Sequence, residues 1–354
     1  MSTSLLRRTT AQLFMVGIPG PTLDPETAAF LADRPPGGVI LFKRNVRTAR
    51  QVRALVDALH ATGSGVRPIV SIDHEGGRVH RLPRPFTHFP PAASWTDPKT
   101  AEAVGLAMGR ELAAVGIDLD FAPVLDVWSN PENRVIGDRA FGTTPAPVAR
   151  AALAQARGLA RGGVLTCGKH FPGHGDTLAD SHFELPTVAK SRRALEAMEI
   201  APFRRAIAAR IPSLMTAHVV YPALDPRRPA TLSPLICRNL LRRRLGFRGV
   251  LFSDDLEMQA VAGRAEPGAI AVGALKAGCD MLLVCQSLAV AAKAMDGVEH
   301  AIARGRLSAD EVATALVRIQ AFRRRLPARR TPGRLAWPAH ARLARRIARD
   351  AAET

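Results

Sequence analysis

The chain has 354 residues, of which 47% are hydrophobic and 23% charged, a composition typical of a globular protein with a large core. No apolar run approaches the roughly 20 residues of a membrane-spanning helix, and residues 1–8 lack the apolar region of a signal peptide. The net charge of +18 is largely arginine. Without interleaved aromatic residues or a nucleic-acid motif, it indicates a solvated basic surface.

The cysteines show none of the C-x-x-C spacing of metal or redox sites. Three of the four lie in or beside apolar runs; the four are Cys167, Cys237, Cys279 and Cys285. We expect reduced, buried thiols and a cytoplasmic protein.

Short apolar runs alternate with helical patterns along the whole chain. We expect strands at residues 13–18, 38–42, 68–73, 117–127, 163–167, 213–217, 249–253 and 281–284. Helical patterns lie between them, at residues 25–33, 48–61, 101–115, 147–161, 192–209, 232–245 and 267–277, and the chain from 288 to 351 is mainly helical.

About eight strands alternating with helices predict an α/β fold closed as a (β/α)8 TIM-type barrel. An open doubly wound sheet is the alternative, but no G-x-G-x-x-G follows the first strand. We expect a single domain over residues 1–354, with a basic helical C-terminal segment from about residue 322.

The densest group of titratable residues lies between Lys169 and His182, where three histidines, two aspartates and a lysine fall within fourteen residues. Pro172, Gly173 and Gly175 exclude a regular helix, so we expect an irregular loop that leaves the preceding strand. Enzymes with α/β folds place much of their chemistry on such loops.

Several other predicted strands also end at polar residues. The full set of strand-end residues is Asp73, Asp126, Lys169, His170, His218 and Asp254. Because the C-terminal ends of barrel strands open on one basin, these residues together predict an active site.

Four sequence motifs lie at or near these strand ends. They are Asp73-His74-Glu75-Gly76-Gly77-Arg78-Val79, Val135-Ile136-Gly137-Asp138-Arg139-Ala140-Phe141-Gly142, Lys169-His170-Phe171-Pro172-Gly173-His174-Gly175-Asp176-Thr177 with Asp180-Ser181-His182, and Phe252-Ser253-Asp254-Asp255-Leu256-Glu257-Met258. Their content and order resemble family 3 of the glycoside hydrolases, and within it the β-N-acetylhexosaminidase (β-N-acetylglucosaminidase) branch of peptidoglycan recycling. The resemblance extends from about residue 11 to residue 320.

The resemblance implies a retaining, exo-acting glycosidase that forms a covalent glycosyl-enzyme and uses no metal or cofactor. It places the nucleophile at Asp254 and the acid/base at His182, whose tautomer and pKa the neighbouring Asp180 would control. Asp255 is the competing nucleophile. Successive side chains leaving a strand point in opposite directions, so we assign Asp255 to the backbone or to the cap of the next helix.

The same resemblance implies which residues bind the sugar. These positions are Asp73, Arg81, Arg139, Lys169 and His170. We expect Glu75 and Arg78 to pair with each other and hold their loop. His74 stands where the family commonly has Gln, a departure that concerns fine specificity more than activity.

Other functions fit parts of the sequence. A family 3 β-glycosidase or phosphorylase would keep the site and change the sugar or replace water by phosphate. A metal-dependent hydrolase would use ligands from the dense segment, and a barrel without activity would bind nucleic acid or a membrane surface through its basic charge. We expect a monomer that acts on a small carbohydrate or muropeptide, with no nucleic-acid partner.

Overall fold

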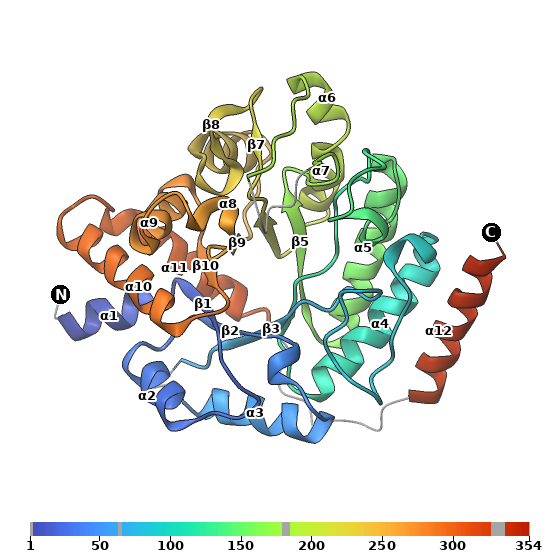
Figure 1. Ribbon diagram of the computed structural model, residues 1–354, viewed down its shortest axis with the longest axis horizontal. Helices are drawn as coiled ribbons and strands as arrows, with labels where there is room; N and C mark the ends of the chain where they lie inside the picture. The colour runs from blue at the N-terminus through green and yellow to red at the C-terminus, as the bar shows by residue number, and fades with distance from the viewer. Residues whose placement is uncertain (1–2, 63–65, 179–184, 327–336, 354) are drawn as a thin grey trace.

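The computed structural model describes residues 3–62, 66–178, 185–326 and 337–353. Eight parallel strands close into a barrel in the order β1-β10-β9-β6-β5-β4-β3-β2, and helices surround it (Figure 1). The predicted (β/α)8 barrel is therefore confirmed. The barrel strands are β1 (Phe14–Gly17), β2 (Gly38–Leu41), β3 (Ile69–Ile72), β4 (Leu119–Asp120), β5 (Leu165–Phe171), β6 (Ser213–Thr216), β9 (Val250–Asp255) and β10 (Met281–Val284).

Strand β1 closes the barrel by pairing with the last strand on one side and the second on the other. Phe14 lies opposite Leu282 of β10, and Met15 lies opposite Gly38 of β2. Because all barrel strands run in the same direction, their C-terminal ends open on one rim.

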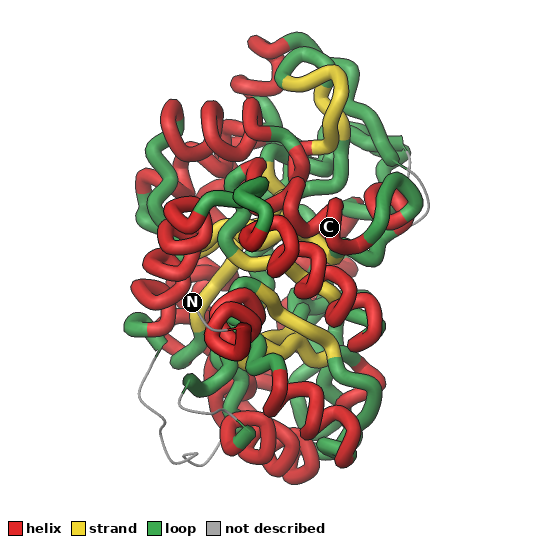
Figure 2. Tube along the Cα trace, turned by 90° about the vertical axis from the view of Figure 1, so that its left-hand side faces the viewer, coloured by secondary structure: helices red, strands yellow, loops and turns green. Residues whose placement is uncertain are grey.

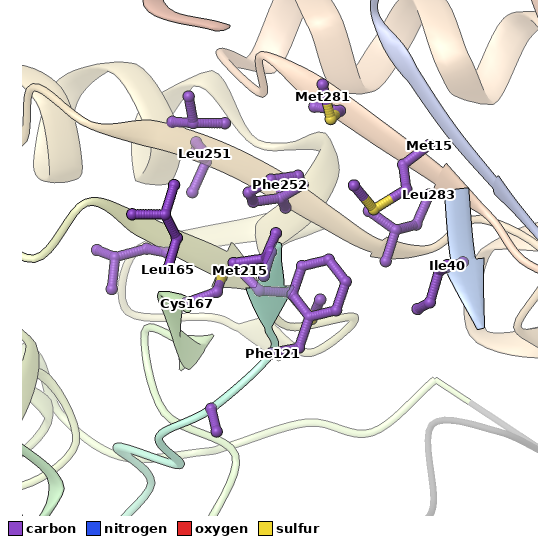
Figure 3. Close-up of a cluster of buried hydrophobic side chains, with 14 of the residues drawn as sticks. Met15, Ile40, Phe121, Leu165, Cys167, Met215, Leu251, Phe252, Met281 and Leu283 are labelled. Atoms are coloured by element: carbon purple, nitrogen blue, oxygen red, sulfur yellow. The ribbon is translucent and has the colours of Figure 1, made fainter. Parts of the chain in front are cut away.

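The interior of the barrel is packed with apolar side chains. Phe121, which follows β4, meets Phe252 of β9 edge to face, with ring centroids 5.2 Å apart. Figure 3 shows these rings among buried side chains from several strands, including Met15, Ile40, Cys167, Met215, Leu251 and Leu283. This filled interior gives the strand ends a rigid base.

Helices form the outer layer of the molecule, as the view in Figure 2 also shows. Several begin at side-chain caps: Asp24 accepts the N–H of Thr27, and Asp97 accepts that of Thr100. The helices are α1 (Thr3–Ala11), α2 (Pro25–Asp33), α3 (Ala49–Ala61), α4 (Pro98–Ala114), α5 (Pro145–Gly162), α6 (Arg192–Ala197), α7 (Ile200–Ala208), α8 (Gln259–Ala262), α9 (Pro267–Ala277), α10 (Leu288–Ala303), α11 (Ala309–Arg323) and α12 (Trp337–Ala352).

Shorter elements complete the chain between the barrel strands. β7 (Val220–Tyr221) and β8 (Asp225–Pro229) form a small antiparallel sheet. The segment Leu235–Arg244 is a π-helix, labelled η5, where the sequence pattern predicts a helix over 232–245. Four 3₁₀ turns are η1 (Lys43–Asn45), η2 (Ala92–Ser94), η3 (Gly137–Arg139) and η4 (Ala230–Leu232).

Two expectations from the sequence are wrong in detail. The predicted helix over 192–209 is divided into α6 and α7 at Met198 and Glu199. Glu199 is fully buried there, and its carboxylate binds the Lys190 ammonium at 2.6 Å. The irregular loop expected from residue 169 begins only at Pro172. Strand β5 continues through Lys169 and His170 because it still pairs with β6 at Phe171.

The C-terminal helix α12 lies against α4 at the outside of the barrel (Figure 1). The Trp337 ring meets the edge of Phe86 at 5.3 Å, and His340 Nδ1 lies 2.7 Å from Glu111 Oε1 of α4. Residues 327–336, which lead to α12, lie outside the described residues. The single domain over residues 1–354 stays a prediction.

All four cysteines are buried free thiols, as predicted, and burial raises the pKa of the Cys167 thiol to about 12. Within the described ranges, the longest apolar helices still fall short of what a membrane crossing requires.

Candidate active site

A pocket of about 560 Å³ opens at the C-terminal ends of the barrel strands. Six predicted site residues line it together, namely Asp73, Arg81, Arg139, Lys169, His170 and Asp254. The remaining two, Asp180 and His182, lie outside the described residues. Segments far apart in the sequence thus meet at one cavity because the closed barrel aligns the ends of β3, β5 and β9.

Lys169 of β5 forms the centre of a charged cluster on one side of the pocket. Its side chain is only 2% exposed, and its Nζ lies 2.6 Å from both Asp73 Oδ1 and Glu75 Oε1. Burial alone would lower the pKa of Lys169, but these two carboxylates outweigh burial and raise it. Lys169 therefore stays cationic and fixes the Asp73 carboxylate at the pocket surface.

Glu75 joins this cluster to Arg139. The Arg139 guanidinium donates from Nε and Nη2 to the two Glu75 oxygens, each at 2.8 Å, and from Nη1 to the carbonyl oxygen of Val135 at 3.0 Å. Burial would raise the pKa of Glu75, but Arg139 and Lys169 hold it well below its usual range. A buried carboxylate with these partners remains ionised at neutral pH.

The predicted pair between Glu75 and Arg78 is wrong. Arg78 instead donates to the carbonyl oxygen of Val135 at 2.6 Å and faces Asp138 at 3.5 Å. Gly76 and Gly77 have φ values of +96° and +52°, so the backbone turns sharply between the two side chains. Glu75 consequently points toward the buried cluster while Arg78 holds the neighbouring loop from outside.

Asp126 supports the histidines of the dense segment. Its Oδ2 lies 2.7 Å from His170 Nδ1, and its Oδ1 accepts the backbone N–H groups of His170 at 3.1 Å and His174 at 2.7 Å. Burial opposes ionisation of Asp126, but the charge and hydrogen bonds of His170 lower its pKa. Asp126 is fully buried and does not line the pocket, so it positions His170 and leaves the other ring nitrogen to face a ligand.

The buried His174 differs from its neighbour. Burial and, to a smaller extent, the charge of His170 lower the pKa of His174 to about 4, so its ring is neutral at physiological pH. Its Nδ1 lies 3.0 Å from Thr177 Oγ1, which ties the turn after β5 together.

Asp254 and Asp255 end strand β9 and have different surroundings. Asp255 Oδ1 accepts the backbone N–H groups of Glu257 and Cys285, both at 3.1 Å, as the predicted structural role requires. Burial raises the pKa of Asp255 to about 7, and the carboxylates of Glu257 and Asp254 act in the same direction. Asp254 Oδ1 accepts the N–H of Asp255 at 2.8 Å, and both residues line the pocket.

Two histidines near the strand ends lie behind the pocket surface. His218 is fully buried, with Nδ1 2.8 Å from Thr231 Oγ1 and Nε2 2.9 Å from the carbonyl oxygen of Asp255. His74 is 1% exposed, and its Nδ1 accepts the backbone N–H of Arg81 at 3.4 Å. His218 therefore stands at a strand end but does not line the pocket. His74 does not line the pocket either, and it supports Arg81, which does.

Arg81 presents a donor that the protein does not satisfy. Its Nε is buried and has no hydrogen-bond partner in the part of the chain that the structure describes. An unpaired buried N–H is costly, so Arg81 Nε is, among the described residues, an unsatisfied donor beside the pocket that Arg81 lines.

Asp120 is a buried carboxyl group that sequence reasoning missed. It accepts the N–H of His74 at 2.9 Å, and its second oxygen has no partner among the described residues. Burial raises its pKa well above the usual value, with Asp73 and Glu75 acting in the same direction. Asp120 is the last residue of β4, but the strand predicted over 117–127 placed it inside an apolar run and hid this strand end.

The strand ends of this parallel barrel bring carboxylates, histidines and buried cations together in one pocket. Enzymes with this fold place their active sites at the same end of the barrel. Residues 5–322 match the model of the glycosyl hydrolase family 3 N-terminal domain. The chain belongs to glycosyl hydrolase family 3 and is a glycoside hydrolase.

Relatives of known name agree with this family. A Beta-hexosaminidase of Alkalilimnicola ehrlichii is 44% identical over 282 residues, which cover 77% of this chain and 80% of the relative. The structure of a family 3 beta-N-acetylglucosaminidase from Paenibacillus sp. FPU-7 is 37% identical with a TM-score of 0.93, covering 98% of this chain and 68% of that one. NagZ from Neisseria gonorrhoeae, solved with N-trifluoroacetyl-D-glucosamine, is 34% identical with a TM-score of 0.79, covering 95% and 98%.

Proposed function

We propose that the chain is an exo-acting β-N-acetylhexosaminidase that releases non-reducing terminal N-acetylglucosamine from β-linked saccharides such as muropeptides. The observation that carries the proposal is the pocket of about 560 Å³ in which Asp254 faces the same cavity as Asp73, Lys169 and Arg81. A cavity of this size accommodates one sugar and part of its leaving group. The names of the relatives, and the N-acylated glucosamine bound to one of them, support the N-acetyl preference.

Asp254 acts as the nucleophile that attacks the anomeric carbon and forms a covalent glycosyl-enzyme, so the anomeric configuration is retained. Its place at the end of a barrel strand gives the carboxylate a rigid backbone from which to approach the sugar. Asp255 is less suited to this role. Its carboxyl group already accepts two backbone N–H groups, and its raised pKa reduces the ionised fraction that a nucleophile needs.

His182 acts as the acid/base, and Asp180 orients it and tunes its pKa. This assignment rests on the motif Asp180-Ser181-His182 and not on coordinates, because both residues lie outside the described ranges. A histidine replaces the second carboxylate that most retaining glycosidases use. An imidazole suits both steps because it titrates near neutral pH and can first give and then take a proton.

The sugar hydroxyls bind to the charged cluster opposite the nucleophile. Asp73 accepts hydrogen bonds from hydroxyls, and Lys169, Arg81 and His170 donate to hydroxyls from their own sides of the pocket. Arg139 already gives Nε and Nη2 to Glu75 and Nη1 to Val135, so only its remaining N–H groups reach the sugar. The cluster is held in place before substrate arrives, which lowers the cost of ordering it on binding.

Substrate-assisted catalysis, in which the acetamido oxygen attacks the anomeric carbon, is the competing mechanism. A 2-fluoro glycoside with a good leaving group should trap the covalent intermediate on the peptide that carries Asp254, which peptide mass spectrometry detects. If no labelled Asp254 peptide forms while the substrate is consumed, the covalent mechanism is refuted.

The central test compares hydrolysis of a p-nitrophenyl N-acetylglucosaminide and the matching glucoside by the wild type, Asp254→Asn and His182→Ala. We expect the wild type to prefer the N-acetylated substrate. Loss of the nucleophile should lower kcat by about four orders of magnitude, and loss of the acid/base by about 10²–10⁴-fold. Asp138→Asn, which removes a half-exposed carboxylate from the same face, serves as the control. If both active-site variants kept full rate, the mechanism would be wrong.

The alternatives are outcomes of the same assay. Preference for the glucoside would indicate a β-glycosidase, and a strong rate increase with phosphate would indicate a phosphorylase. Full activity after chelation is expected, since the proposal assigns no step to a metal. We further propose that the enzyme is a cytoplasmic monomer. A salt-dependent DNA mobility shift without hydrolase activity would favour the basic binding protein instead.

A further inference from the structure

A second cavity, of about 490 Å³, lies at the opposite end of the barrel from the active site. Its wall includes Pro212 and Gly249, which directly precede strands β6 and β9, together with parts of α7 and α11. These positions mark the N-terminal ends of the strands, whereas the proposed catalytic residues lie at the C-terminal ends. The cavity is therefore a separate site on the molecule.

Arginines form the charged part of this cavity. Arg210, Arg248 and Arg325 line it with exposed side chains, and none of them forms a side-chain hydrogen bond or ion pair within the described ranges. The described residues that line the cavity include no carboxylate. A fourth lining arginine, Arg318, already binds Asp280 at 2.9 Å. Three arginines thus line one concave site whose described lining residues include no carboxylate.

Arg210 occupies a backbone position that favours glycine. It follows α7 with φ = +58°, a left-handed conformation, and its N–H donates to the carbonyl oxygen of Ile207. Residues other than glycine and, less often, asparagine or aspartate are unfavourable in this conformation. The arginine side chain is present at this position despite its backbone cost, and it lines the cavity.

The rest of the cavity is apolar. Ile207, Ile211 and Phe322 contribute to its wall beside the arginines. A guanidinium binds phosphate oxygens through paired N–H groups, and an apolar wall accommodates a flat or aliphatic group attached to that phosphate. The volume lies within the range of cavities that bind small molecules.

We propose that this cavity is a binding site for a phosphorylated small molecule of nucleotide size, with its phosphates on Arg210, Arg248 and Arg325 and its apolar part against Ile207, Ile211 and Phe322. The concave shape favours a compact ligand over a nucleic-acid strand, which needs an extended charged groove. The proposal does not depend on which glycoside the enzyme hydrolyses.

The test is calorimetric titration of the full-length protein at low ionic strength with ADP, inorganic pyrophosphate and adenosine. We expect saturable binding of ADP, weaker binding of pyrophosphate, which lacks the apolar part, and no measurable binding of adenosine. Arg248→Ala should weaken ADP binding by about tenfold, the effect of losing one charge-assisted contact. Equal affinity for pyrophosphate and ADP, or no saturable binding of ADP, would overturn the proposal.

Arg210→Gly separates ligand binding from folding. Glycine relieves the left-handed backbone, so the unfolding midpoint should rise or stay unchanged while ADP binding weakens by a similar factor. Arg204→Ala is the matched control, because Arg204 is an exposed arginine of α7 that does not line the cavity. Hydrolase activity should be the same in all variants. Equal loss of ADP binding in the control, or tighter binding of duplex DNA than of ADP through the same arginines, would show a diffuse basic surface and refute the site.

Discussion

Replacing Glu75 by Gln keeps the shape of the side chain but removes its charge from the centre of the buried cluster. The wild-type cluster has two cations, Lys169 and Arg139, and two carboxylates, Asp73 and Glu75, so its net charge is zero. After substitution it carries one uncompensated positive charge. Glu75 also accepts three charge-assisted hydrogen bonds at 2.6–2.8 Å, and a Gln oxygen keeps only part of them. We expect a loss of about 3–5 kcal/mol in the free energy of unfolding at pH 7.

The effect of Glu75→Gln should also depend on pH with a defined sign. The folded pKa of Glu75 lies well below its ordinary value of 4.5, so its contribution to stability is complete above that value and is lost as pH falls toward the folded pKa. The difference between wild type and variant should therefore be constant from pH 7 to about pH 5. Below pH 4.5 it should shrink by about 1.4 kcal/mol per pH unit.

Urea unfolding of both proteins at pH 7, 5 and 3.5, followed by tryptophan fluorescence, measures these differences. Glu132→Gln is the control, since Glu132 is exposed at the rim of the same pocket and its loss should change stability by no more than about 0.5 kcal/mol. A cost below about 1 kcal/mol at pH 7 for Glu75→Gln, or a difference that does not shrink in acid, would refute the electrostatic account of the cluster.

Two further substitutions probe packing, one at the outer helix α12 and one at the turn after β5. His340→Ala should lower the free energy of unfolding by about 1–3 kcal/mol, because it leaves the buried Glu111 carboxylate without one partner. Urea unfolding measures the loss. An unchanged unfolding midpoint would show that α12 contributes little to stability. Gly175→Ala should prevent correct folding, since the new Cβ would lie 1.7 Å from the backbone carbonyl oxygen of Val127, which cannot rotate away as a flexible side chain could. Gly20→Ala is its control, because the new Cβ would lie 3.9 Å from its nearest neighbour, the carbonyl oxygen of Thr22. Near-ultraviolet circular dichroism with soluble yield distinguishes the two variants.

The architecture could be predicted from the sequence because each barrel strand is a short apolar run that ends at a turn or polar residue. The same pattern located the pocket: Asp73, Lys169, His170 and Asp254 stand at strand ends and line one cavity. Element boundaries were less predictable. The division between α6 and α7 falls at Met198 and Glu199, beside the ion pair of Glu199 with Lys190, and a helical pattern contains neither feature.

Side-chain partners depend on the closure of the barrel and could not be predicted from neighbouring residues. The sequence favoured Arg78 as the partner of Glu75 because only two residues separate them. The observed partner Arg139 is 64 positions away, and Lys169 is 96 positions from Asp73. The arginines of the C-terminal helix, Arg342, Arg345 and Arg346, are exposed as the predicted solvated surface requires. The contact that holds α12, the buried His340 at Glu111, joins positions 229 residues apart and could not be predicted from that composition.

These long-range pairs join three strand-end segments into one electrostatic unit. Val135 holds Arg139, Arg139 holds Glu75, and Glu75 shares Lys169 with Asp73. A change in the loop around residue 135 therefore acts on the Asp73 carboxylate without touching it, through a chain of contacts that are each 3.0 Å or shorter. Because Asp73 and Lys169 also line the pocket, the same contacts that stabilise the folded barrel set the orientation of the groups proposed to hold the sugar.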